Sequence, residues 1–467
     1  MAKRTRRWLL TSAQNETEIY KPFWKNLHAY AAHIGAEILI GPFTYNVGAF
    51  TDHTTRRNAF AADLHPYLAF ERVALGNVLF CAEMNTLPTA VRPLSGLTSY
   101  TQGHWGIFPH AKVQLETVPT MPGQQPPIIM TTGCCTVKNY TPTKAGVKAS
   151  FHHVVGATLL EIDQQNRHFC RQLNATEDGS FQDLDTEVKH GRICPGKKVE
   201  AITWGDIHTA QLDPAIAKSA WGLDPITMDL YDTGGMIDEL KPQHQFFHDL
   251  FDGESINHWL ENKPLERYES FVNGQLDVVK EVRQACEFLR ASQRHWCRSH
   301  VIESNHDNPW LMRWLQKPID DLTNAEAYHR WNLAYLEAVR GGDWNFSVFK
   351  YVLKENDKRG LAEINFIPEG DSFKICTQMG GIECGLHGHR GSNGSRGSTV
   401  ALSRLGTKIN KGHDHTAAIL DGTYSCGVCG PSRRLLRGPH TWSASHILTY
   451  SNGKRSIITM QDGKWRA

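Results

Sequence analysis

Five short polar clusters in the second half of the chain constrain its fold more than any other feature. Each cluster contains Asp, Asn or His, and most follow an apolar, β-prone run. Strand ends of this kind deliver side chains into a site at the edge of a sheet. Oxygen and imidazole ligands without thiolates favour Mn, Fe, Zn or Mg over a structural zinc knot. In chain order, the clusters are Gly205–His208, His248–Asp252, Ser304–Asp307, Leu386–His389 and Gly412–His415.

The residue types in these clusters suit phosphodiester hydrolysis by two divalent metal ions. Two ions about 3.5–4 Å apart activate a water and shield the phosphate oxygens. A carboxylate can bridge two ions, and neutral ligands leave the pair positively charged. We expect Asp249 to be the bridge, although Asp232 lies in a similar context. The expected ligands are Asp206, His208 and His415 for one ion and Asn305, His387 and His413 for the other.

Two neighbouring residues are candidates for catalysis. His306 follows the expected ligand Asn305, so it cannot easily reach the same ion. It is free to act as a general acid or as a donor to the transition-state oxygen. Asp307 is expected to orient the His306 imidazole.

The clusters resemble the signature motifs of the calcineurin-like metallophosphoesterases. The motifs are Asp-x-His at 206–208, Asn-His-Asp at 305–307 and Gly-His-x-His at 412–415. The resemblance covers about residues 199–450. It implies an α/β (α+β) fold with a two-sheet sandwich flanked by helices, and two divalent metal ions, often Mn. The chain departs from the family at His248 and Ser304, where the family usually has Gly. In the fourth cluster, either His387 or His389 could be the ligand. The family's usual His-Gly-His motif favours His387.

A narrower resemblance is to the early host-genome-degrading DNases of T5-like bacteriophages. It rests on His-Asp-Leu-Phe-Asp at 248–252, on Asn257-His258, and on the Gly-rich run after His387, behind an extra N-terminal unit. This resemblance implies DNA as the substrate, the cytoplasm of an infected bacterium as the setting, and a homo-oligomer.

Further residues are candidates for substrate binding. Arg390 and Arg396 flank a Gly-rich loop and are able to grip a phosphate backbone, although a solvated loop is equally expected. His258 and His389 lie near enough in sequence to reach a substrate. The basic run at 433–437 is expected to be a solvated face. Cys426 and Cys429 lack a second ligand pair, so we interpret them as buried thiols.

The first 198 residues are expected to form a separate, smaller α/β domain, followed by the catalytic domain at 199–467. A strand at 8–11, a helix at 18–34 ended by Gly35, and a strand at 36–40 predict a βαβ start with a parallel strand pair. In the second unit we expect strands before each of the first three clusters and one long helix at 265–297. A hairpin is expected around Asn452-Gly453.

Composition sets broad limits on function. With 467 residues, 40% hydrophobic and 21% charged, the chain has the composition of a soluble globular protein with two domains. No apolar run is long enough to span a bilayer, and no export signal is present, which favours the cytoplasm. Eleven cysteines without regular spacing argue against a disulfide framework. A net charge of +2 neither requires nor excludes nucleic acid.

Two other functions remain open from the residues alone. One is a small-substrate phosphatase or cyclic-nucleotide phosphodiesterase, against which the 198 extra residues argue mildly. The other is a non-catalytic scaffold with the same fold, which would be expected to have lost ligands. Every expected ligand type is present, which favours catalysis.

Overall fold

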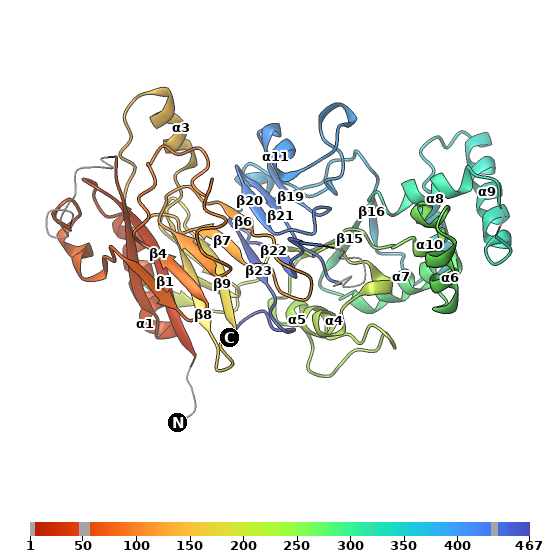
Figure 1. Ribbon diagram of the computed structural model, residues 1–467, viewed down its shortest axis with the longest axis horizontal. Helices are drawn as coiled ribbons and strands as arrows, with labels where there is room; N and C mark the ends of the chain where they lie inside the picture. Colours follow the sequence, from red (N-terminus) through yellow and green to blue (C-terminus); the bar gives the residue numbers. More distant parts are fainter. Residues whose placement is uncertain (1–4, 46–56, 320, 431–437) are drawn as a thin grey trace.

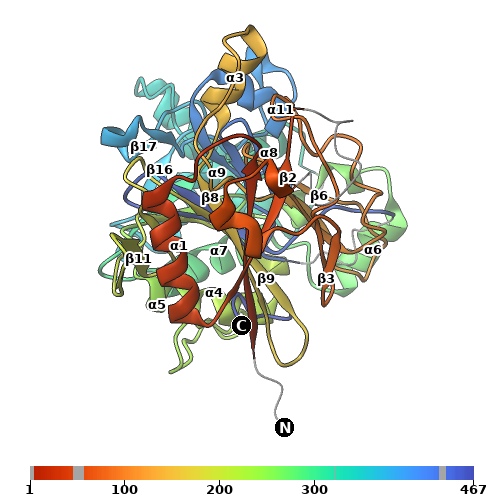
Figure 2. The same ribbon diagram turned by 90° about the vertical axis from the view of Figure 1, so that its left-hand side faces the viewer.

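The computed structural model describes residues 5–45, 57–319, 321–430 and 438–467. The chain opens with β1 (Arg6–Gln14), α1 (Lys21–Ile34) and β2 (Glu37–Phe43), and β1 and β2 pair in parallel as predicted. Gly35 ends α1 in the left-handed conformation, with φ 64°, and its N–H donates to the Ala31 carbonyl. Figure 2 shows α1 alongside this first sheet.

Two small sheets occupy the N-terminal part. The first has the order β2-β1-β8-β9, because the hairpin of β8 (Gly156–Ile162) and β9 (His168–Asn174) adds antiparallel to β1. The turn-rich stretch after residue 174 forms the second, a three-stranded meander. Its strands are β10 (Phe181–Asp183), β11 (Thr186–Lys189) and β12 (Arg192–Cys194).

A six-stranded sheet carries the first three polar clusters. Its order is β16-β15-β14-β13-β22-β23, and the first four strands run parallel. The predicted hairpin around Gly453 supplies the last two strands. The strands are β13 (Ala201–Thr203), β14 (His244–Phe247), β15 (Arg298–Ile302), β16 (Asn365–Ile367), β22 (Ser445–Thr449) and β23 (Arg455–Thr459).

A ten-stranded sheet runs across the predicted boundary at residue 198. β6 (Leu115–Thr117) pairs antiparallel with β20 (Ala418–Leu420), so segments on both sides of residue 198 share one sheet. Figure 1 shows these strands side by side, orange against blue. The division into two domains stays a prediction. The remaining strands are β3 (Arg72–Leu75), β4 (Val78–Cys81), β5 (Trp105–Phe108), β7 (Ile128–Thr131), β17 (Lys374–Ile375), β18 (Ile382–Glu383), β19 (Lys408–Lys411) and β21 (Thr423–Ser425).

The two large sheets share buried side chains. Phe246 and Ile302 of the six-stranded sheet belong to one apolar cluster with Ile375 and Ile382 of the ten-stranded sheet. A second cluster joins strands of the six-stranded sheet to α4 (Pro214–Trp221), α5 (Met236–Leu240) and α7 (Val278–Ser292). The chain is therefore a mixed α/β protein with mixed sheets and flanking helices.

The predicted single helix at 265–297 is wrong, because the structure has two helices there. α6 (Pro264–Val272) ends before Gly274, which adopts φ 65°. α7 then begins after Asp277, whose side chain accepts the N–H of Lys280 as an N-cap. The apolar spacing continued through the break, but a left-handed glycine and a new cap interrupt the helix.

Most other helices gather at one end of the molecule (Figure 1). These are α8 (Asn308–Leu315), α9 (Ala325–Arg340) and α10 (Val348–Asn356), whereas α3 (Lys144–His152) and α11 (Thr399–Leu402) lie elsewhere. Short 3-10 helices cover Ala62–Tyr67, Thr209–Gln211, Glu254–Ile256, His258–Leu260, Thr377–Met379, Ser392–Gly394 and Ser403–Leu405. Within the described ranges, no helix combines the length and apolarity needed to cross a bilayer.

Candidate metal centre

The fold brings all five polar clusters to one place. The first three follow the adjacent parallel strands β13, β14 and β15, so they emerge at the same sheet edge. The fourth and fifth follow β18 and β19, which pair in parallel in the other large sheet. The expected ligands therefore come from the facing ends of two sheets.

Asp249 lies at the centre of the site, and its two oxygens face different partners. Oδ1 is 3.3 Å from His387 Nε2. Oδ2 is 3.6 Å from His208 Nε2 and 3.8 Å from His415 Nε2. Two groups of metal-binding geometry result, His208–Asp249–His415 and Asp249–His387–His413, with all ligand atoms in a group within 4.8 Å of one another. This is the arrangement expected of a bridging carboxylate.

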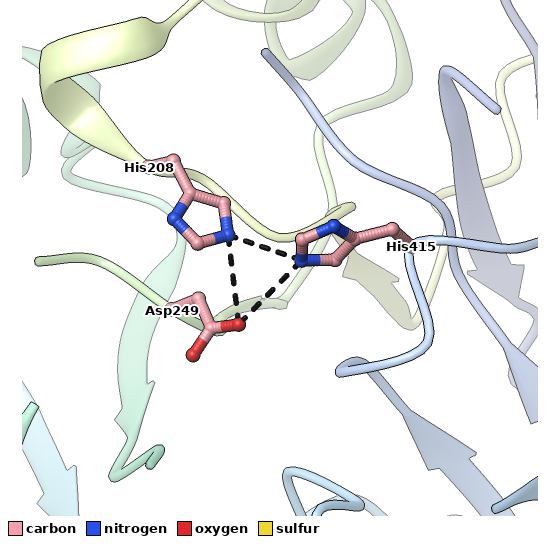
Figure 3. A group of neighbouring side chains, drawn as sticks. All are labelled: His208, Asp249 and His415. Atoms are coloured by element: carbon pink, nitrogen blue, oxygen red, sulfur yellow. Dashed lines mark hydrogen bonds and ion pairs between the residues drawn. The ribbon is translucent and has the colours of Figure 1, made fainter. Parts of the chain in front are cut away.

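In the first group, two imidazoles point their nitrogens at each other (Figure 3). The Nε2 atoms of His208 and His415 are 3.1 Å apart. His208 Nδ1 is 3.2 Å from Asp252 Oδ1, and a carboxylate only accepts, so Nδ1 carries a proton. Burial lowers the pKa of His208, but the hydrogen bond and charge of Asp252 raise it overall to about 9. Positive charge is thus favoured between the two rings, as a proton or as a bound cation.

Asp206 completes the first group. Its Oδ2 accepts the His413 N–H at 2.8 Å and lies 3.3 Å from His415 Nε2. Its Oδ1 is buried without a hydrogen-bond partner among the described residues. Burial and the nearby Asp249 raise the pKa of Asp206 well above its ordinary value. A divalent cation bound to this carboxylate would offset the cost of burying its charge and the cost of leaving one oxygen without a hydrogen-bond partner.

The second group combines Asp249, His387 and His413 with Asn305. Asn305 Oδ1 is 3.1 Å from His387 Nε2, and the His387 and His413 rings lie 5.2 Å apart. Burial holds the pKa of His387 well below its ordinary value and lowers that of His413 to about 4. Burial disfavours ionised Asp249, but the surrounding imidazoles, that of His387 first, hold the pKa of Asp249 well below the ordinary value. Neutral imidazoles around a carboxylate are suitable ligands.

Four of the expected ligands have a left-handed backbone. The φ angles are 49° for His208, 44° for Asp249, 76° for His413 and 54° for His415. Residues other than glycine rarely adopt this region, and such strain gathers at functional sites. The conformation turns each side chain towards the shared centre.

The two departures from the family pattern are accommodated locally. His248 is buried, and its Cβ lies close to Gly412: a Cβ added to Gly412 would meet Asp206 Oδ1 at 2.2 Å and His248 Cβ at 3.0 Å. Gly412 therefore provides the space that the extra side chain needs. Ser304 closes a turn, because its Oγ accepts the His306 N–H at 3.1 Å.

His306 stands beside the first group. Its ring lies 5.1 Å from that of His208 and stacks on Trp310 at 4.2 Å between centroids. His306 Nδ1 is 3.2 Å from the Asp252 carbonyl oxygen, so Nδ1–H donates and Nε2 is available for proton exchange. The expected orientation by Asp307 is wrong. Asp307 instead accepts the main-chain N–H groups of Ser304 and Phe251, and burial and Asp249 raise its pKa to about 8.

The expected substrate-binding residues lie around the rim of the site. His389 Nε2 is 3.0 Å from Glu369 Oε1, and Arg390 donates to the same carboxylate. His387, rather than His389, belongs to a ligand group. Arg396 is exposed on the Gly-rich loop. His258 contacts the Trp310 ring edge-on at 5.3 Å.

The structure also shows where other residues singled out in the sequence lie. Asp232 is exposed, which leaves Asp249 as the central carboxylate. The thiols of Cys426 and Cys429 are buried against main-chain oxygens, as predicted. The basic run at 433–437 lies outside the described residues.

Sequence reasoning assigned no role to three residues that shape the site. Asp252 holds both His208 and His306, and Trp310 stacks on His306. Trp442 contacts the His415 ring at 4.5 Å. The signals available were the Asp-x-x-Asp spacing from Asp249 and an aromatic residue, Trp310, four positions after His306. No local pattern marks Trp442, because tertiary folding alone brings it to the site.

Comparison with known proteins identifies one phage relative. No family model matches the chain, and no solved structure matches it. The sequence is 37% identical over 486 aligned residues to "Protein A1" of Escherichia phage T5, an alignment that covers 100% of this chain and 84% of that protein. Identity of this extent along the full chain shows common descent and a shared fold. The chain therefore belongs to the family of phage T5 Protein A1.

Proposed function

We propose that the chain is a two-metal phosphodiesterase that cleaves DNA. The observation that carries the proposal is Asp249, whose two oxygens each face a separate group of ligands. Two ions sharing one carboxylate suit phosphodiester hydrolysis. The metallophosphoesterase sandwich is part of this proposal, supported by two large sheets that share a core and deliver the five motifs.

The ligand chemistry fits two divalent ions. Asp206, His208, Asp249 and His415 would hold one ion, and Asp249, Asn305, His387 and His413 the other. Mixed oxygen and imidazole ligands suit Mn, with Mg, Fe or Zn as alternatives. When bound, the ions supply Lewis acidity and an activated water at neutral pH.

Residues of the chain supply positioning and proton transfer. His306 presents Nε2 towards the substrate side while its Nδ1–H is held by the Asp252 carbonyl oxygen. A proton on Nε2 would be donated to the leaving oxygen as it departs or would stabilise the transition-state oxygen. Stacking on Trp310 fixes the plane of the imidazole. Arg396 and, after release from Glu369, Arg390 would contact the phosphate backbone.

The phage relative supports a setting for this chemistry. A family that includes a T5 protein fits action in the cytoplasm of an infected bacterium, where host DNA is present as a phosphodiester substrate. We therefore propose host DNA as the substrate.

The test is digestion of linear and circular double-stranded DNA by purified protein with Mn²⁺. EDTA and the variant His413→Ala serve as controls. We expect metal-dependent degradation that both controls abolish, and cleavage of the circle would show endonuclease action.

Two other outcomes would contradict the proposal. Hydrolysis of bis(p-nitrophenyl) phosphate without DNA cleavage would keep the metal centre but move the substrate to a small phosphodiester. Inactivity on both substrates at saturating Mn²⁺ would favour a non-catalytic scaffold.

A further inference from the structure

A cavity of about 400 Å³ opens beside the metal centre and takes its walls from both halves of the chain. Trp105 and Gln124 come from the N-terminal half, whereas Asp213, Trp442 and Asp462 come from the C-terminal half. None of the ligands and substrate contacts described above lines it. Its position therefore calls for a separate explanation.

The cavity adjoins the first ligand group. Val428, in its wall, forms a β-bridge with the ligand Asp206, and the next residue, Cys429, donates its N–H to the Asp206 carbonyl at 2.8 Å. On another side, the Ser443 N–H donates to the His415 carbonyl at 3.0 Å. The half-buried Trp442 ring contacts the His415 ring and also lines the cavity. Val428, Trp442 and Ser443 thus line the cavity and also contact residues of the first ligand group.

The described part of the lining offers no cation for a phosphate and suits a nucleobase. Among the described residues, the wall contains no Lys or Arg, and the two carboxylates Asp213 and Asp462 would repel an anion. Two tryptophans, Ile216 and Met460 supply flat or apolar surface, and amide and carboxylate groups supply partners for the N–H groups of a base. Aromatic side chains commonly stack on bases of single strands.

We propose that this cavity receives a base of the DNA strand whose phosphate lies at the metal centre. The inference rests on the proposed function and deepens it, because it makes the enzyme prefer a nucleoside-bearing phosphodiester. It also gives the N-terminal half a role, since Trp105 and Gln124 form part of the base-binding wall.

The test compares two esters, thymidine 5′-(p-nitrophenyl phosphate) and bis(p-nitrophenyl) phosphate, which lacks a base. In Trp442→Ala, we expect the ratio of kcat/KM for the first ester over the second to fall about tenfold, the usual effect of losing one stacking partner. Trp442→Phe should restore most of the ratio. Trp344→Ala is the matched control, because Trp344 is 78% exposed and lies outside the site.

A second variant tests the cavity without changing a metal ligand. Ala215 lines the cavity at the exposed start of α4, so Ala215→Trp would fill it without touching a ligand. We expect the same fall in the ratio, with Mn²⁺ content measured by mass spectrometry equal to that of the wild type. An unchanged ratio in both Trp442→Ala and Ala215→Trp would overturn the inference.

A binding measurement keeps this inference distinct from the proposed function. Fluorescence anisotropy of a labelled thymidine tetranucleotide, in EDTA, reports the cavity without catalysis. Binding weakened about tenfold by Trp442→Ala and by Ala215→Trp, but not by Trp344→Ala, supports the base site even if hydrolysis fails. Equal binding by all four proteins contradicts it even if DNA is cleaved.

Discussion

Asp249 shows how one side chain organises the centre. Its left-handed backbone, with φ 44°, turns the carboxylate so that one oxygen faces His387 and the other faces His208. A buried carboxylate flanked by imidazoles stays ionised. Ionised oxygens on both sides are what two cations need.

His306 is expected to affect turnover without affecting metal binding. His306→Asn removes the exchangeable Nε2 proton but no ligand, so kcat should fall about 10²–10⁴-fold while Mn²⁺ content is kept. The measurement is single-turnover hydrolysis together with metal analysis. His329→Asn, at an exposed position on α9, is the control. Loss of metal in His306→Asn would show that His306 is a ligand.

Asp252 is expected to strengthen the binding of the first ion through its hydrogen bond to His208. Its carboxylate holds His208 Nδ1, and such partners of metal-binding histidines typically contribute 10–100-fold in metal affinity. We expect Asp252→Asn to weaken Mn²⁺ binding by about that factor in isothermal titration calorimetry. Asp232→Asn, at an exposed position, should not change it. Unaltered affinity in Asp252→Asn would contradict the role.

At the scale of elements, the loop after β19 depends on Gly412. This loop carries His413 and His415 and passes against Asp206 and His248. Buried Lys411 anchors it by donating to Asp414 Oδ2 at 2.7 Å. The loop therefore has little room to move away from its neighbours.

Gly412→Ala is expected to disrupt the centre, because the added methyl would lie 2.2 Å from Asp206 Oδ1. We expect Mn²⁺ binding and hydrolysis to fall at least tenfold, comparable to losing a partner of a ligand. Gly438→Ala, whose added methyl would meet no atom of the described residues within 4 Å, is the control. Wild-type metal binding in Gly412→Ala would show that the loop shifts freely.

A buried acid on α7, Glu281, holds the loop that follows Asp252. The Glu281 carboxylate accepts the main-chain N–H groups of Glu254 at 2.9 Å and Ser255 at 3.1 Å. Burial raises the pKa of Glu281 to about 8, although the hydrogen bonds from Ser255 act to lower it. A pKa that is higher in the folded state means that stability is lost as pH rises.

The resulting pH dependence is testable. Unfolded Glu titrates near pH 4.3, so the contribution of Glu281 should be complete below about pH 4 and decrease as pH rises to about 8. Gln does not titrate, so the Tm of wild type relative to Glu281→Gln should fall between pH 5 and 8 in calorimetric scans. Glu71→Gln, at an exposed position, should show no such trend. A constant difference across this range would contradict the raised pKa.

At the scale of the whole molecule, α6 exposes an apolar face. Leu265, Tyr268, Phe271 and Val272 recur at helical spacing, and each is 64–79% exposed. Contiguous exposed apolar surface of this kind marks protein contacts. The homo-oligomer expected from the sequence fits this surface, with a second copy of the chain as the partner.

We expect the wild-type chain to self-associate, and we expect acidic residues introduced on α6 to prevent this association. Tyr268→Glu combined with Phe271→Glu should reduce the molar mass in light scattering from that of an oligomer to that of one chain. Leu405→Glu, at another exposed apolar position, is the control. A wild-type chain that is monomeric at micromolar concentration would contradict the expectation, and an oligomer that survives the double change would place the interface elsewhere.

The sequence alone predicted the local elements and the candidate ligands. Short apolar, β-prone runs predicted β1, β2, β13, β14 and β15, because strand formation here depends on local pattern. The ligand types and their order predicted the groups around Asp249, because each motif is short and lies at a strand end. The sequence failed at 265–297, where apolar spacing continued through a break set by Gly274 and Asp277.

Only the tertiary structure decided which distant segments meet. The pairing of β6 with β20 spans about three hundred residues, and no local pattern encodes a partner so far away. The same holds for Trp442 beside His415, for Asp252 beside both His208 and His306, and for the cavity between the two halves. These contacts arise from the packing of whole sheets, so they become visible only once the chain is folded.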